Sequence, residues 1–168
     1  DGVISDSAPE SFAVALLTYA QRVGATRFGA LAEALASGPL PDADRLAADG
    51  LYGEFLELMP LGNRAEDFAI SLFALEAGRA LADQREYDAF RAELDEGWLR
   101  AFHERFYENR AAFARRDPLG WRRLMRPFPR FLEILRRRAG TFHDPLLVAN
   151  FARILGVPPK EAPAAASS

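Results

Sequence analysis

The 168-residue chain contains no cysteine, which excludes disulfide bonds, thiolate nucleophiles and cysteine-ligated metal sites. Histidine is nearly absent as well, since the chain has only His103 and His143. A di-iron helical bundle requires a repeated Glu-x-x-His motif, but Arg100 and Gly140 stand three residues before these histidines. We therefore predict that the protein holds no metal and no cofactor.

Lysine occurs once, as Lys160, so the chain has no Gly-x-x-x-x-Gly-Lys-Ser/Thr loop for phosphate transfer. A Gly-x-Ser-x-Gly nucleophile motif is also missing. No apolar run approaches the roughly 20 residues that a transmembrane helix needs, so we predict no membrane span and expect a soluble, cytoplasmic protein. These absences favour an interaction module over an enzyme.

Valine, isoleucine and threonine are sparse, whereas alanine, leucine and 13 phenylalanines supply the apolar residues. This composition and its helical periodicity predict an all-α fold, a single-domain bundle of about seven helices over residues 1–157. A central apolar helix is expected near 64–84 and a long helix near 86–115. Residues 158–168 are small and polar, which predicts a disordered C-terminal tail.

Several helix ends carry recognisable signals. Ser7 and Glu10 have capping-box spacing at the start of the first helix, and Thr26 suits the N-cap of the second. A third helix is expected from Pro41 to about Met59. Asp117 and Pro118 form an N-cap and first-turn pair that predicts a short helix to Arg126.

Polar residues interrupt the apolar faces of the two helices expected near 64–84 and 86–115. If these helices pack together, six residues share one interior seam. The seam could form a pocket for a small anion or polar ligand, as in a helical ligand-binding protein or enzyme. Alternatively, it is a structural ion-pair network. We favour the network, because buried charges require partners. Its members are Glu76, Arg79, Arg91, Asp95, Arg105 and Asn109.

His103 is a further candidate for proton transfer, because Glu96 and Tyr107 lie seven and four residues from it on the same helix. A single histidine with an acidic neighbour is more often an ordinary surface residue. We interpret His103 in that way and predict no catalytic residue.

Charge is segregated along the chain. Residues 1–99 carry 7 arginines and 18 acidic residues, whereas residues 100–138 carry 12 arginines and 4 acidic residues. The outward-facing arginines of the second stretch form what we call the six-arginine cluster, opposite a side that carries Trp121 and Leu124. Its members are Arg115, Arg116, Arg122, Arg123, Arg126 and Arg130.

The six-arginine cluster has three interpretations. In the first, it is a docking surface for an acidic protein partner or assembly, including the acidic part of a second copy. In the second, it binds the phosphate backbone of RNA or single-stranded DNA as an accessory subunit. In the third, its charge is neutralised within the fold. A pI of about 5.5 counts against nucleic acid. We therefore expect a non-enzymatic helical interaction module that docks onto an acidic protein through this arginine-rich surface.

Overall fold

The computed structural model describes residues 5–62 and 64–127. The chain divides into two compact units. The first is Ser7–Met125; to the second belong β1 (Ser5–Asp6) and β2 (Arg126–Pro127), which pair antiparallel. The part of the predicted bundle after Pro127 and the tail at 158–168 lie outside the described residues. The single domain expected over 1–157 stays a prediction.

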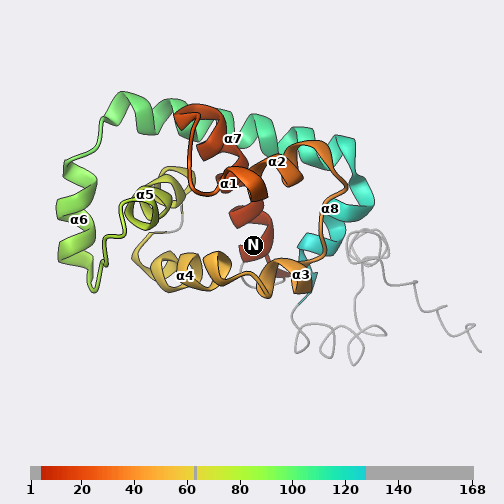
Figure 1. Ribbon diagram of the computed structural model, residues 1–168, viewed down its shortest axis with the longest axis horizontal. Coiled ribbons are helices and arrows are strands. Elements are labelled where there is room, and N and C mark those ends of the chain that lie inside the picture. Colours follow the sequence, from red (N-terminus) through yellow and green to blue (C-terminus); the bar gives the residue numbers. More distant parts are fainter. Residues whose placement is uncertain (1–4, 63, 128–168) are drawn as a thin grey trace, which may run out of the picture. The chain divides into compact units, whose positions relative to one another are not determined.

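The unit Ser7–Met125 is built from α-helices, which confirms the all-α prediction. A short 3-10 turn, Met59–Leu61, follows the fourth helix. Figure 1 shows that α6 and α8 lie at opposite ends of α7. The helices of this unit are α1 (Ala8–Val23), α2 (Gly29–Ser37), α3 (Ala43–Ala47), α4 (Gly50–Leu58), α5 (Ala65–Glu76), α6 (Gln84–Ala92), α7 (Glu96–Arg116) and α8 (Pro118–Leu124).

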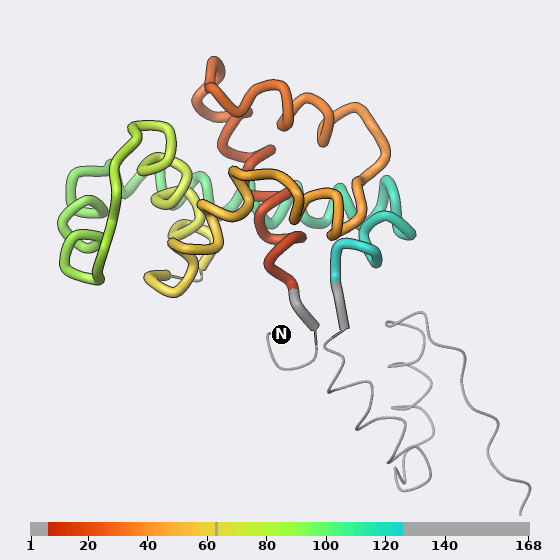
Figure 2. Tube along the Cα trace, turned by 60° about the horizontal axis from the view of Figure 1, so that its bottom comes forward, coloured from red at the N-terminus to blue at the C-terminus, as the bar shows by residue number. Residues whose placement is uncertain are grey.

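Helix α1 is the most enclosed of these helices, since every residue from Phe12 to Tyr19 is buried. A helix that is apolar on all sides has to be covered on all sides. It packs against α2, α5 and α7, and the Phe12 ring meets the rings of Tyr52 and Phe55 at centroid distances of 5.3 and 5.2 Å. The tube in Figure 2 shows the chain leaving α2 and returning through α3 and α4 towards α5.

Helix α5 is apolar and buried, as expected for the helix near 64–84, but it ends at Glu76. Gly78 has φ 62°, a left-handed conformation that favours glycine. The Gly78 N–H donates to the Leu75 carbonyl at 3.1 Å and the Arg79 N–H to the Ala74 carbonyl at 2.8 Å. This is a Schellman ending, and it satisfies carbonyls that the helix leaves open.

The helix expected near 86–115 is two helices, α6 and α7. The Asp95 carboxylate accepts a hydrogen bond from the Trp98 N–H at 2.6 Å and so caps the start of α7. The chain therefore breaks before Asp95, because the aspartate stabilises a new helix start there.

Two further sequence signals act differently from the prediction. The helix expected from Pro41 to Met59 is divided into α3 and α4, because Asp49 accepts from the Leu51 N–H at 2.9 Å and begins a new helix. The prediction of a capping box at the start of α1 is wrong. Ser7 makes no side-chain cap, and the Glu10 carboxylate is buried against Arg110 of α7.

Candidate functional site

The six polar residues of the predicted seam do not meet in one place. Glu76, the last residue of α5, binds the loop between α1 and α2 instead of α7. Its carboxylate accepts from the Thr26 hydroxyl and, at 3.1 Å, from the Arg27 N–H. Thr26 therefore does not cap α2 as predicted, since Phe28 occupies that position and the Thr26 hydroxyl is directed to Glu76.

Three seam residues lie at the surface. Arg79 forms a 2.7 Å ion pair with Glu93, and Arg105 forms a 2.8 Å ion pair with Glu108. Each side chain of these pairs is more than 40% exposed. Asp95 is exposed as well and is engaged as the cap of α7. Solvent-exposed pairs of this kind contribute little to stability and enclose no ligand.

Asn109 is the one seam residue in the core, where it is 6% exposed. Its amide donates to the Thr18 hydroxyl at 2.9 Å and to the Gln21 side-chain oxygen at 3.0 Å. The Thr18 hydroxyl donates in turn to the Val14 carbonyl at 2.7 Å. This chain of bonds satisfies a buried amide and joins α7 to α1.

Arg91, the last seam residue, belongs to a network that the sequence did not reveal. The buried Asp67 carboxylate accepts from Arg91 at 3.1 Å, from the Tyr87 hydroxyl at 2.8 Å and from the Arg64 N–H at 3.0 Å. Burial raises the pKa of Tyr87, and its hydrogen bond to Asp67 raises it further. Asp67 lies in the first turn of α5, where an acidic residue indicates only a helix start. The network holds α5 to α6.

His103 pairs with Glu66 of α5, not with Glu96. Its Nδ1 atom lies 2.7 Å from the Glu66 carboxylate, and its ring centroid is 5.0 Å from that of the exposed Tyr107. Burial acts to raise the pKa of Glu66, but the hydrogen bond from His103 lowers it below its ordinary value.

No group of three potential ligands in the described ranges could hold a metal ion. Residues 5–62 and 64–127 contain no helix long and apolar enough to cross a membrane.

Within the unit Ser7–Met125, the members of the six-arginine cluster do not all lie on one open surface, because Arg116 is engaged within the fold. Arg126 lies in β2, which belongs to the other unit, and Arg130 lies outside the described residues. Arg116 is engaged at the C-terminal end of α2, where it donates to the carbonyls of Leu35 at 2.8 Å, Ala36 at 2.5 Å and Gly38 at 3.3 Å. It caps a helix end from another part of the chain.

Helix α8 begins as the sequence predicts. Asp117 accepts from the Gly120 N–H at 2.8 Å, and Pro118 occupies the first turn. Asp117 also accepts from the Leu40 N–H at 3.1 Å, which fixes α8 to the segment before α3. The two backbone hydrogen bonds, from Gly120 and from Leu40, lower the pKa of Asp117 below its ordinary value.

The two sides of α8 differ in exposure. Trp121 and Leu124 pack against the core, and the Trp121 ring lies beneath the Arg110 guanidinium with 6.0 Å between the Cζ atom and the ring centroid. The opposite side, which we call the α8 surface, consists of Leu119, Arg122 and Arg123. These positions are three and four residues apart and so lie together on one face of the helix.

Leu119 is 66% exposed, more than any other large hydrophobic residue in the described ranges. Arg122 and Arg123 are exposed on either side of Leu119. Arg115, near the end of α7, is exposed as well. None of these three arginines forms an ion pair with another residue that the structure describes. The α8 surface thus offers an apolar side chain between two cations.

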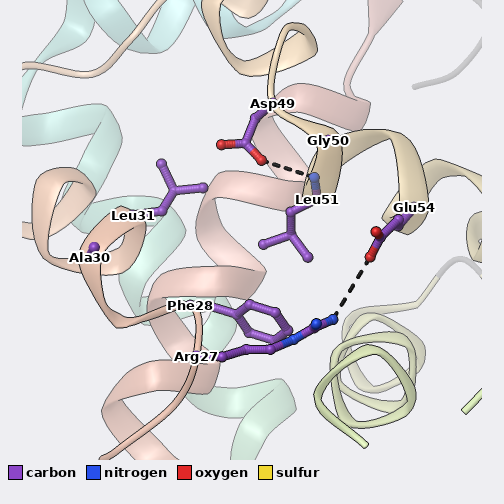
Figure 3. A pocket seen from close by; sticks show the side chains of 8 residues that line it. All are labelled: Arg27, Phe28, Ala30, Leu31, Asp49, Gly50, Leu51 and Glu54. Carbon is purple, nitrogen blue, oxygen red and sulfur yellow. Dashed lines mark hydrogen bonds and ion pairs between the residues drawn. The ribbon is translucent and has the colours of Figure 1, made fainter. Parts of the chain in front are cut away.

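An open groove of about 370 Å³ lies between α2 and α4 (Figure 3). Leu31 of α2 and Leu51 of α4 line its two sides. Towards one end Arg27 and Glu54 form a 3.8 Å ion pair, and Asp49 lies towards the other. The full lining is Arg27, Phe28, Ala30, Leu31, Asp49, Gly50, Leu51 and Glu54.

The sequence signal for this α2–α4 groove is weak. Glycine stands at positions 50 and 53 of an otherwise acidic and apolar segment, and a Cβ atom at Gly50 would meet nothing within 4 Å. Glycine at that point leaves the groove open, but periodicity alone does not show that α2 forms the other side.

Neither a protein-family model, a curated protein nor a solved structure matches the chain.

Proposed function

We propose that the protein is a non-enzymatic helical interaction module that uses the α8 surface to dock onto an acidic protein partner in the cytoplasm. The observation that carries the proposal is the position of Leu119, exposed between Arg122 and Arg123 on one face of α8. The segment of the partner that fits this surface has an apolar residue flanked by carboxylates.

The apolar and charged parts of the α8 surface have different roles. Covering Leu119 with an apolar partner residue contributes about 1–2 kcal/mol of binding free energy. Arg122 and Arg123 attract the acidic partner over a longer range, raise the association rate and orient the encounter. The combination selects a partner that is both acidic and apolar over one that is only acidic.

The α8 surface is fixed before a partner arrives. Asp117 caps the helix and also binds the Leu40 N–H, while Leu124 is fully buried on the inner side. A surface held in one conformation loses little conformational entropy on binding. A helix of only seven residues depends on these anchors, because it is too short to be stable alone.

The same arginines would also contact phosphates, so nucleic acid is the competing partner. Proteins that bind single strands combine cations with exposed aromatic rings on which bases stack. On α8 the one aromatic residue, Trp121, is packed against the core, and the exposed side chain is Leu119. An aliphatic anchor favours a protein partner.

The test uses a fluorescent peptide in which leucine is flanked by glutamates, titrated with the protein and followed by anisotropy. The expected result is saturable binding that weakens as salt rises. The double variant Arg122→Glu/Arg123→Glu is expected to bind roughly ten-fold more weakly or worse, since two attractions become repulsions.

The matched control is Arg85→Glu/Arg100→Glu, which changes the net charge equally at exposed positions on α6 and α7. It should bind the peptide nearly as the unchanged protein does. Equal weakening in both double variants would mean that only overall charge matters, and this outcome contradicts the proposal. Tighter binding of a single-stranded oligonucleotide than of the peptide would identify nucleic acid as the partner class.

A further inference from the structure

The α2–α4 groove has the chemistry that the α8 surface requires of a partner. We propose that the acidic partner is a second copy of this chain, whose α2–α4 groove receives Leu119 while its carboxylates meet Arg122 and Arg123. This inference rests on the proposed function, because it names the partner of the same α8 surface.

The groove provides apolar walls for the leucine. Leu31 and Leu51 line its sides, and Phe28, which is 5% exposed and has the Arg27 guanidinium over its ring, lines it as well. Its volume of about 370 Å³ exceeds that of one leucine side chain and leaves room for the aliphatic stems of the two arginines. Complementary apolar surfaces of this kind contribute the main part of the binding energy.

The charges of the groove are opposite to those of the α8 surface. Its lining has two carboxylates, Asp49 and Glu54, and one guanidinium, Arg27. Arg27 is held by a 2.6 Å hydrogen bond to the Leu75 carbonyl, and its 3.8 Å separation from Glu54 is longer than a hydrogen bond. The Glu54 side chain is 57% exposed and is therefore available to an incoming arginine.

The chain does not fill its own groove with Leu119. The bond from the Leu40 N–H to Asp117 and the buried Leu124 fix α8, and Leu119 is exposed in that position. A projecting apolar residue and a pocket that fits it elsewhere on the same molecule produce a contact between copies. Such a contact either closes reciprocally into a dimer or continues as a longer assembly.

The first measurement is sedimentation velocity of the whole chain from micromolar to near-millimolar concentration. The expected result is a mass that rises with concentration at low salt and returns towards the monomer when the ionic strength is raised ten-fold. Leu119→Ser should shift the association to at least several-fold higher concentration, and Arg85→Glu/Arg100→Glu should associate as the unchanged protein does.

The second measurement is complementation between two variants. Arg122→Glu/Arg123→Glu alters the α8 surface and keeps the groove, whereas Ala30→Arg places a cation at an exposed position on the groove wall and keeps the α8 surface. Each variant alone is expected to remain monomeric. An equimolar mixture should form a heterodimer, because each variant supplies the surface that the other has lost.

Three outcomes overturn the inference: a wild-type chain that is monomeric at every concentration, an Ala30→Arg variant that associates normally, or a mixture that stays monomeric. The peptide titration separates these failures from failure of the proposed function. A chain that binds the acidic peptide through the α8 surface but does not self-associate docks onto a different acidic protein.

Discussion

Arg110 of α7 donates from its Nε and Nη2 atoms to the two carboxylate oxygens of Glu10 in α1, at 2.8 and 3.1 Å. Glu10 is fully buried, and the Arg110 side chain is 32% exposed. Burial raises the pKa of Glu10, and the attraction of Arg110 opposes that rise. The guanidinium also lies over the Trp121 ring, so one side chain joins α1, α7 and α8.

Arg110→Met is expected to lower the free energy of unfolding by about 3–5 kcal/mol, because it leaves a buried carboxylate without its cation. Urea denaturation followed by circular dichroism measures this change. The double variant Glu10→Met/Arg110→Met removes both charges and should recover a large part of the loss. If the double variant is as unstable as the single one, the cost lies in packing and not in the unpaired charge.

Arg116→Gln should separate stability from binding. Loss of the hydrogen bonds to the carbonyls at the end of α2 is expected to lower the free energy of unfolding by about 1 kcal/mol. Affinity for the acidic peptide should change little, since Arg116 is engaged within the fold. A large loss of affinity without loss of stability would return Arg116 to the binding surface.

Gly120→Ala is expected to destabilise the protein by about 1–3 kcal/mol, because the added methyl overpacks a closed site. Its Cβ atom would overlap the Asp117 carboxylate and lie 2.9 Å from the Leu40 Cβ atom. Gly53→Ala is the matched control in α4, where a Cβ atom meets nothing within 4 Å. It should stabilise the helix by about 0.5–1 kcal/mol. Thermal denaturation of the two variants should therefore move in opposite directions.

Glu66 should make stability depend on acid pH. Its pKa in the folded protein lies below the ordinary value of 4.5, so the folded state favours the ionised form. The resulting stability is present above pH 4.5 and is lost as pH falls through the folded pKa. Glu66→Gln should therefore be less stable than the unchanged protein near neutral pH, and the difference should shrink towards acid pH in urea titrations. A difference that stays constant with pH would contradict this.

Local signals predicted α8 correctly. Asp117 and Pro118 specify its start, and the spacing of Trp121 and Leu124 specifies its inner face. Arg122 and Arg123 are then outward, whereas Gly120 on the same helix is buried by contacts with another part of the chain. These inferences succeed because a cap and a helical period depend only on neighbouring residues.

The predicted seam failed because periodicity gives a face and not the partner of that face. Arg105 and Asn109 are four residues apart on α7, and both donate to the Gln21 side-chain oxygen of α1 instead of meeting the seam residues expected on α5. Glu76 lies at the end of α5, so it binds the neighbouring loop. The cluster interpretation of Arg116 failed for the same reason, since the carbonyls that it caps are about 80 residues away.

The sequence by itself determined the helical class, the exclusion of cysteine chemistry, the start of α8 and the arginines on its outer side. The tertiary structure decided that Glu10 pairs with Arg110 and that Arg116 caps α2. It also decided that Leu119 is exposed between two arginines and that α2 and α4 form a groove. The division has a physical cause: caps and periodicity act within a few residues, whereas burial and charge pairing depend on segments that only folding brings together.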